Sequence, residues 1–228
     1  RMEDLIEFSK EHNVQIGTIK DLIQHRLDSS NPVEFVSKSK IPTDFGNFTG
    51  HVFKDTVDNT EHIALTLGDY LNSEDTMVRV HSECLTGDTL FSSKCDCGSQ
   101  LSNALNTISE NGSGVLLYMR GHEGRGIGLG NKIKAYSLQD DGEDTVDANL
   151  KLGFKNDQRD YGTGALILRS LGIEKMNLLT NNPQKRAGLE GYGLSIAKRT
   201  PLLGEKTPEN KKYLETKETR MGHNFNEE

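Results

Sequence analysis

The spacing of apolar residues changes near Gly98, and this change most constrains the fold. Before it, apolar and polar residues alternate in segments 51–54, 62–67 and 77–81. A period of two is typical of strands whose sheet has one face buried. After it, apolar residues recur at steps of three and four from Leu101 to Ile108, which predicts a helix ending near Gly112.

Beyond this helix, strands and helices are predicted to alternate. Compact apolar segments at 115–119 and 176–180 predict buried strands, and the spacing over 165–171 predicts a helix. Asp144 and Asn182 stand where helix caps are expected, the second followed by Pro183. We therefore predict an α/β fold: a mixed β-sheet with flanking helices, a β-rich N-terminal portion and a layered α/β C-terminal portion.

The chain is predicted to contain three parts. Residues 1–30 are predicted to form two short helices, the second capped by Thr18, followed by a turn-rich linker. Residues 31–207 are expected to form the main domain, and the charged segment 208–228 a partly mobile tail. Because the sequence begins with Arg1, we expect it to be an excerpt of a longer protein.

Composition excludes two classes of partner. No apolar run approaches the ~20 residues that a membrane-spanning helix needs. The net charge of −7 argues against a general surface for duplex nucleic acid, although a local basic pocket stays possible.

The three cysteines of the chain, Cys84, Cys95 and Cys97, lie within fourteen positions. An odd, closely spaced set is a poor disulfide framework and is typical of a soft-metal site. Three thiolates without an obvious fourth ligand predict one Zn²⁺ per chain that keeps a position open for water. We expect Cys95 and Cys97 to lie in an extended segment. The alternative is three buried thiols that only pack.

The residues before Cys84 raise a rival interpretation. His81, Ser82 and Glu83 resemble the His-x-Glu element of zinc deaminases, but the Pro-Cys-x-x-Cys element is absent from the sequence. Alternation is expected to place Arg79, His81 and Glu83 on one face of a strand. Their nearness to Cys84 favours a site over a solvated strand face.

Two loops that follow predicted strands are candidate anion sites. In segment 120–132, amides at Gly124, Gly126 and Gly128 are expected to reach a phosphate with help from Arg125. In segment 180–185, a capped helix start carries Lys185 in its first turn. Two such loops favour a polyphosphate ligand, whereas a merely flexible connection is the alternative. The charged cluster 157–160 is equally compatible with a site and with a solvated turn.

Together these segments resemble GTP cyclohydrolase II over residues 41–222. The resemblance rests on these motifs, which occur in order: His81-Ser-Glu-Cys84, Cys95-Asp-Cys97-Gly, Gly124-Arg-Gly-Ile-Gly-Leu, Ala135-Tyr-Ser-Leu-Gln-Asp140, Asp144-Thr-Val-Asp-Ala-Asn149, Leu179-Thr-Asn-Asn-Pro183, Tyr213-Leu-Glu-Thr-Lys and Met221-Gly-His. Residues 1–26 resemble the tail of the 3,4-dihydroxy-2-butanone 4-phosphate synthase domain that precedes this one in bifunctional riboflavin biosynthesis enzymes.

The resemblance implies hydrolysis of GTP to 2,5-diamino-6-ribosylamino-4(3H)-pyrimidinone 5′-phosphate, formate and pyrophosphate, the first committed step of riboflavin biosynthesis. It implies Zn²⁺ on the three cysteines, Mg²⁺ with the triphosphate, a homodimer, and a cytoplasmic protein, or a plastid one in a plant. The implied substrate-binding residues are Arg79, Val80, His81, Ser82, Glu83, Gln100, Glu123, Gly124, Arg125, Thr145, Thr180 and Lys185.

The implied catalytic residues are Asp157 as proton acceptor, Arg159 as nucleophile and Tyr136 in ring opening. Elementary chemistry favours a different role for Arg159, because a guanidinium with a pKa above about 12 is a poor nucleophile and a good electrostatic clamp. The sequence leaves these two roles open. It also leaves open a module that binds a nucleotide without turning it over.

Overall fold

The structure, a computed structural model, describes residues 2–18, 21–22, 25, 31–71, 75–155 and 157–224. The chain divides into two compact units, Arg1–Asn31 and Pro32–Glu228. This division lies close to the expected boundary at residue 30, which itself falls outside the described residues. The three-part domain organisation stays a prediction.

The first unit contains the helix α1 (Met2–His12), none of whose residues is buried. The predicted cap at Thr18 is present, because its Oγ1 accepts a hydrogen bond of 3.0 Å from the backbone N–H of Asp21. The helix predicted after it lies partly outside the described residues, which omit residues 19–20 and 23–24.

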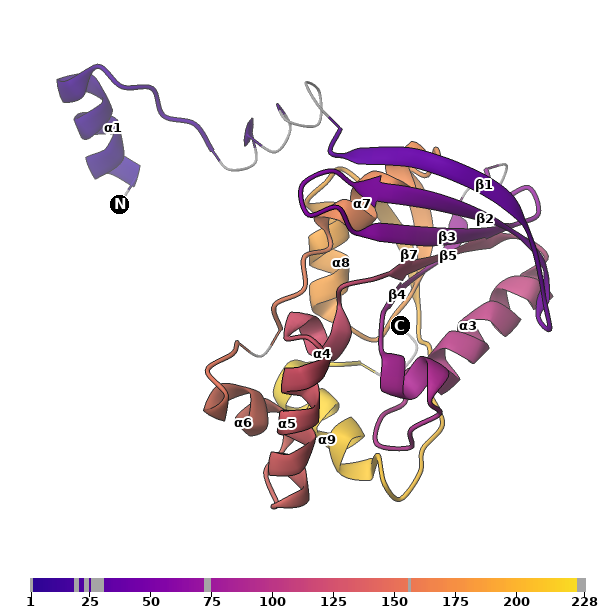
Figure 1. The fold of residues 1–228 in the computed structure, drawn as a ribbon. Coiled ribbons are helices and arrows are strands. Elements are labelled where there is room, and N and C mark those ends of the chain that lie inside the picture. The colour runs from indigo at the N-terminus through magenta and orange to yellow at the C-terminus, as the bar shows by residue number, and fades with distance from the viewer. Residues whose placement is uncertain are drawn as a thin grey trace. The chain divides into compact units, whose positions relative to one another are not determined.

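In the second unit, the described residues form one seven-stranded sheet of order β1-β2-β3-β5-β4-β6-β7 (Figure 1). The pairs β1–β2, β2–β3 and β3–β5 are antiparallel, and β5–β4, β4–β6 and β6–β7 are parallel. The predicted α/β class and its β-rich N-terminal portion are therefore confirmed. The strands are β1 (Val33–Thr43), β2 (Gly46–Asp55), β3 (Glu61–Leu67), β4 (Thr76–Ser82), β5 (Gly114–Met119), β6 (Lys175–Leu179) and β7 (Ser195–Thr200).

The two edge strands are absent from the sequence prediction. In β1, seven consecutive residues after Val33 are exposed, and β7 contains no fully buried residue. An edge strand has a partner on one side only and here faces solvent, so it carries no regular apolar alternation. Pro42 near the end of β1 is compatible with that edge position.

Helices cover both faces of the sheet. The helix α3 (Cys97–Asn111) packs its Ala104, Leu105 and Ile108 against Leu116 of β5 in the main core cluster. On the other face, α7 (Gly162–Ser170) approaches Leu117 at Gly164. Successive residues of a strand point to opposite faces, so this strand is buried on both sides.

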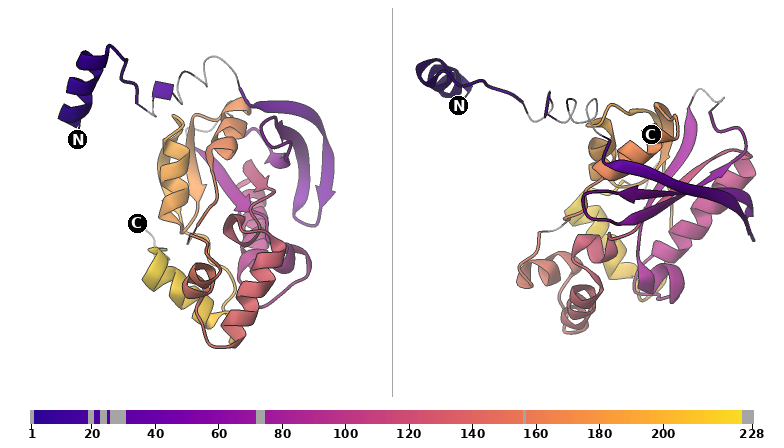
Figure 2. Two further views of the ribbon diagram at one scale, coloured as in Figure 1. Left: turned by 60° about the vertical axis from the view of Figure 1, so that its left-hand side comes forward. Right: turned by 45° about the horizontal axis from the view of Figure 1, so that its top comes forward.

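Most of the remaining helices lie at the carboxyl ends of the parallel strands, whereas the helix Pro183–Glu190 packs against α7 and β7. Figure 1 shows α4, α5, α6 and α9 together at this end of the sheet, and Figure 2 shows the same grouping from two other directions. Their bounds are η1 (Leu85–Thr89), α4 (Glu123–Gly126), α5 (Leu129–Asp140), α6 (Thr145–Lys151), α8 (Pro183–Glu190) and α9 (Lys211–Met221). None of the helices that the structure describes is long and apolar enough to span a bilayer.

The predicted helix ends are confirmed. The Asp144 side chain accepts from the amides of Val146 and Asp147, and Asn182 accepts from that of Gln184. Gly112 ends α3 with φ of 76°, a left-handed conformation that glycine adopts without steric cost.

The segment after residue 207 was expected to be a partly mobile tail. In the structure its residues 211–221 form α9, where Leu214, Thr216 and Lys217 are buried. Several of the charged residues that suggested a tail, such as Lys211 and Glu215, lie on the exposed face of this helix, whereas Lys217 lies on its buried face.

Replacement of Ile108 by Ala is expected to lower the free energy of unfolding by about 2–5 kcal/mol, because its fully buried side chain would leave a cavity under the sheet. The matched control is Ile133→Ala on α5, where the side chain is 50% exposed and the change should stay within about 0.5 kcal/mol. Urea unfolding followed by circular dichroism measures both. Equal destabilisation of the two variants would contradict this assignment of the core.

Candidate active site

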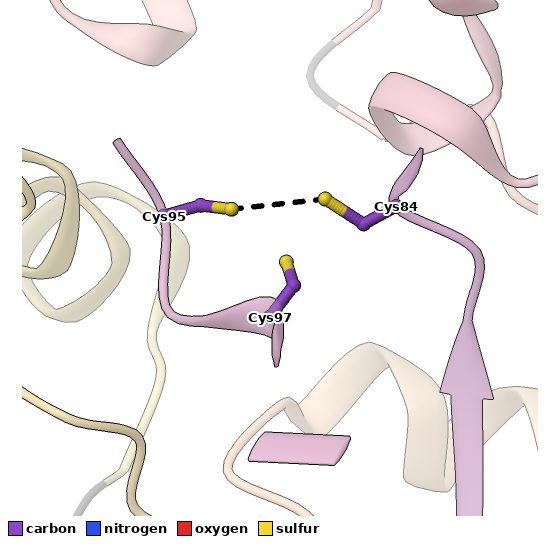
Figure 3. Close-up of side chains that lie close together, drawn as sticks. All are labelled: Cys84, Cys95 and Cys97. Carbon is purple, nitrogen blue, oxygen red and sulfur yellow. Dashed lines mark hydrogen bonds between the residues drawn. The ribbon is translucent and has the colours of Figure 1, made fainter. Parts of the chain in front are cut away.

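Three sulfur atoms form a cradle at the carboxyl end of β4. Cys84 follows this strand directly, whereas Cys95 lies in a bend and Cys97 is the first residue of α3. The expectation of an extended segment for Cys95 and Cys97 is therefore wrong, because α3 begins there. Figure 3 shows the three side chains converging from these elements. Their Sγ atoms lie within 4.8 Å of one another.

The cradle fits a tetrahedral metal ion. The Sγ atoms of Cys84 and Cys95 are 3.7 Å apart and form no disulfide. Two thiolates that each lie about 2.3 Å from a tetrahedral zinc are about 3.8 Å from one another. A Cβ at Gly87 would lie 2.8 Å from the Sγ of Cys95 and 3.1 Å from that of Cys84. Within the described residues this potential metal-binding group has three members, which agrees with the predicted open position.

Polar contacts hold Cys84 in the cradle. The Lys132 ammonium donates to the Sγ of Cys84 at 3.0 Å, and the backbone N–H of Cys84 donates to the Asp88 carboxylate at 3.0 Å. Hydrogen bonds from the Cys95 and Cys97 thiols lower the pKa of the Cys84 thiol, and Lys132 lowers it further. These contacts favour the thiolate, the form that binds metals.

Glu123 holds residues that surround the three cysteines. Its carboxylate accepts from Lys132 at 2.6 Å, from the backbone N–H of Leu85 at 2.6 Å and from that of Gly124 at 3.1 Å. It is not among the residues lining the cavity. Glu123 therefore holds Lys132 and the loop after Cys84, and its expected contact with the substrate stays a prediction.

The cradle opens into a cleft of about 990 Å³, which includes its solvent-open mouth. Three cations meet in this cleft: Arg79 from β4 and Lys185 from α8, which are buried, and the partly buried Arg159 from the loop before α7. Clefts with converging polar side chains are typical of small-molecule sites. Cations gathered in a buried cleft favour an anionic ligand.

Arg79 and Lys185 donate to neutral oxygen atoms. Arg79 donates to the carbonyl of Leu179 at 2.9 Å and to the side chain of Gln100 at 2.8 Å, while its buried Nε has no hydrogen-bond partner among the described residues. Lys185 donates to the carbonyl of Val80 at 2.8 Å. Burial lowers the pKa of Arg79 to about 10, and burial together with Arg79 and Arg159 lowers that of Lys185. An anion in the cleft would relieve this cost.

Arg159 is held by Asp157. The carboxylate accepts from Nε at 2.9 Å and from a terminal nitrogen at 2.5 Å. Burial disfavours the guanidinium cation, but Tyr161 and Asp157 outweigh burial and raise the pKa of Arg159. Asp157 does not line the cleft, whereas Arg159 does. In the charged cluster 157–160, Asp157 and Arg159 therefore form a partly buried ion pair at the cleft, whereas Gln158 and Asp160 are exposed.

The glycine-rich loop differs from its predicted form. Gly124 and Arg125 have φ of 59° and 65°, and α4 is only four residues long. The amides of Gly124, Gly126 and Gly128 donate within the loop, to Glu123 and to the carbonyls of His122 and Glu123. They are not free for a phosphate, so the expected cradle of amides is wrong. Gly124 and Arg125 still line the cleft.

His81 presents an acceptor to the cleft. Its Nε2 donates to the carboxylate of Asp88 at 3.1 Å, because a carboxylate only accepts. Burial lowers the pKa of His81, so the ring is neutral and Nδ1 carries a lone pair. This Nδ1 is buried without a partner among the described residues.

Most of the predicted site residues line one cleft. They are Arg79, His81, Ser82, Glu83, Gln100, Gly124, Arg125, Tyr136, Thr145, Arg159, Thr180 and Lys185, with the three cysteines. The exceptions are Val80, Glu123 and Asp157, which do not line the cleft. They accept hydrogen bonds from three residues that do, Lys185, Lys132 and Arg159 respectively. The prediction that Arg79, His81 and Glu83 share one strand face applies only within β4, which ends at Ser82.

Sequence reasoning missed several lining residues: His122, Ile127, Lys132, Ala135, Gln139, Asn149, Asn181, Asn182, Tyr213, Lys217 and His223. Lys132, Ala135, Tyr136 and Gln139 recur at steps of three and four on α5, a signal that could have revealed this face of the helix. Residues 213–223 were assigned to a tail and named only as motifs of the family resemblance, so none of them was predicted to belong to the site.

The fold and the cleft define an α/β protein with a group of three cysteines that could hold a metal ion beside a cluster of cations, at the carboxyl ends of parallel strands. The family model described as GTP cyclohydrolase II matches residues 34–201. The chain belongs to this family.

Curated relatives support this assignment. The chain is 55% identical over 224 residues to riboflavin biosynthesis protein RibBA of Bacillus subtilis, covering 98% of this chain and 56% of that protein. It is 52% identical over 225 residues to bifunctional riboflavin biosynthesis protein RIBA 1, chloroplastic, of Arabidopsis thaliana, covering 99% and 41%. The chain thus spans about half the length of the curated relatives it matches.

A solved structure is also similar. It is a crystal structure of RibBX, a two-domain 3,4-dihydroxy-2-butanone 4-phosphate synthase from A. baumannii, with a TM-score of 0.51 and 27% identity. The similarity covers 88% of this chain and 49% of that one.

Replacement of Gly87 by Ala is expected to abolish metal binding, because the added Cβ would enter the space between the sulfurs. The control is Gly130→Ala on α5, where nothing lies within 4 Å and alanine favours a helix. Zinc per chain, measured by atomic emission, should fall from one to near zero only in the first variant. Full zinc content in a folded Gly87→Ala chain would show that the ion does not occupy the cradle.

Proposed function

We propose that this chain is a zinc-dependent GTP cyclohydrolase II, which converts GTP to 2,5-diamino-6-ribosylamino-4(3H)-pyrimidinone 5′-phosphate, formate and pyrophosphate. This reaction would place it at the first committed step of riboflavin biosynthesis. The observation that carries the proposal is the joining of a three-sulfur metal cradle and a cluster of buried cations in one cleft. Family membership supports it.

Cys84, Cys95 and Cys97 would hold the zinc. When bound, the ion supplies a Lewis acid that makes water acidic enough to act as a nucleophile near neutral pH. Lys132, paired with Glu123 and donating to Cys84, offsets negative charge on the sulfurs. The chain thus provides a cradle that stays open to substrate on its cleft side.

The triphosphate would bind the cations of the cleft. Arg79, Lys185 and Arg125 can donate to phosphate oxygens, and Mg²⁺ is expected to accompany the nucleotide. These cations would also stabilise the negative charge that develops as pyrophosphate leaves. Thr145 and Thr180 line the same cleft and can donate hydroxyl hydrogen bonds.

The base would meet neutral donors and acceptors near the cradle. His81 offers Nδ1 as an acceptor for an N–H group. Burial and the Cys95 sulfur raise the pKa of Tyr136, which therefore keeps its hydroxyl proton at neutral pH. Tyr136 can then donate this proton to a nitrogen or oxygen atom of the opening ring.

For Arg159 the geometry supports the electrostatic role. Pairing with a carboxylate stabilises the cation, and the buried pair aims a fixed charge into the cleft. Asp157 then acts by orienting Arg159.

Replacement of Arg159 by Lys is therefore expected to retain measurable turnover, while Arg159→Met loses about 100-fold or more in kcat/KM, because only the second variant removes the charge. Steady-state release of pyrophosphate measures both. Equal loss in the two variants, together with a guanylyl group attached to residue 159 in the wild-type chain, would establish the covalent role instead.

The reaction itself is tested with the zinc-loaded chain, GTP and Mg²⁺. Formate and pyrophosphate are expected in equal amounts, with an absorbing diaminopyrimidine. Removal of zinc by a chelator should abolish all three products, and zinc added back should restore them. Calorimetric binding of GTP without products would instead indicate a binding module, and released ammonia a deaminase.

We further propose that the chain forms a homodimer, and that it works in the cytoplasm of a microbial source or the plastid of a plant. The relatives from rice and Arabidopsis whose names include "chloroplastic" motivate the second location. Light scattering of the purified chain tests the dimer.

A further inference from the structure

The C-terminal helix α9 lies beyond residues 34–201, which the family model matches. It nevertheless contributes to the cleft, which is lined by Tyr213, Lys217 and His223 among others. Among these, Lys217 pairs with Asp96, the residue between Cys95 and Cys97 in the chain.

Lys217 forms a buried ion pair with Asp96, which stands between two of the three sulfur ligands in the chain. Its Nζ lies 2.5 Å from Oδ1 of Asp96, and the two side chains are 8% and 0% exposed. A buried carboxylate that loses its cation is strongly unfavourable. The backbone that carries Cys95 and Cys97 is therefore constrained by a charge supplied from α9.

Asp96 extends this contact into the cleft. Its other oxygen accepts from the Gln100 amide at 2.6 Å, and Gln100 in turn accepts from Arg79 at 2.8 Å. The chain before α9 also packs closely here, since a Cβ at Gly204 would lie 2.6 Å from the Cβ of Asp96. One carboxylate thus connects the helix, the metal loop and a cation of the cleft.

Other contacts hold α9 in place without Lys217. Arg220 donates to both oxygens of Asp147, at 2.8 and 2.9 Å, and Lys212 donates to the carbonyls of Gly142 and Glu143. Loss of Lys217 would therefore release Asp96 rather than the whole helix.

We propose that Lys217 is a positioning residue for the metal cradle, fixing through Asp96 the orientation of the Cys95 and Cys97 sulfurs. This inference rests on the metal site of the proposed function and deepens it. The hydrogen bond that Lys217 donates goes to Asp96 and not to a sulfur. Lys217 therefore acts on the metal ligands indirectly, as residues around a metal site commonly do.

The test measures zinc affinity by chelator competition, with no nucleotide present. In Lys217→Met the dissociation constant for zinc is expected to rise about 10–100-fold. Lys217→Arg, which keeps the charge, should stay within about threefold of wild type, and Lys217→Gln should fall between them. The matched control is Lys211→Met on the exposed face of the same helix, which should leave zinc affinity unchanged.

A second readout separates positioning from general stability. Cobalt substituted for zinc reports ligand geometry through its absorption bands, and these are expected to shift in Lys217→Met and Lys217→Gln but not in Lys211→Met. A folded Lys217→Met chain with wild-type zinc affinity and cobalt spectrum would overturn the proposal. If that variant does not fold, Lys217→Gln decides by the same two measurements.

Failure of the proposed function is distinguishable from failure of this inference. A chain that binds zinc in a Lys217-dependent way but never releases formate would refute the function and leave the inference standing. A chain that hydrolyses GTP while Lys217→Met and Lys217→Gln keep wild-type zinc affinity would do the reverse.

Discussion

Three ion pairs support the wall of the cleft. Lys132–Glu123 lies behind Cys84, Arg159–Asp157 lies beside the cation cluster, and Lys217 pairs with Asp96, which stands between the other two cysteines in the chain. In each pair the basic residue lines the cleft, whereas none of the three carboxylates is among its lining residues. Removal of one partner leaves an uncompensated buried charge, so each pair strongly favours a single arrangement of the wall around it.

The cations that remain explain the preference for an anion. Arg79 and Lys185 donate to carbonyl and amide oxygens, which do not neutralise their charge. Burial disfavours the charged form of both groups and lowers their pKa. A triphosphate supplies the missing negative charge, and this complementarity is the physical basis of the proposed substrate class.

The sequence predicted the central elements and most of the site. Strands β5 and β6 are buried on both faces, so their apolar segments were clear, whereas β4 was recognised by its alternation. Caps at Asp144 and Asn182 were recognisable from residue type alone. Edge strands β1 and β7 lack such a pattern because solvent covers them. The amides of the glycine-rich loop were misjudged, because their hydrogen bonds depend on how the loop closes on itself.

By itself the sequence determined which chemical groups are present: three closely spaced thiols, a set of cations and the helix caps, all of which depend on residue type and local spacing. Only the tertiary structure decided which of them face the cleft. Glu123 and Asp157 lie behind its wall, whereas Lys132 and Lys217 line it. The physical reason is that burial of a charge is favourable only beside a partner, and partners such as Lys217 and Asp96 are far apart in the chain and meet only on folding.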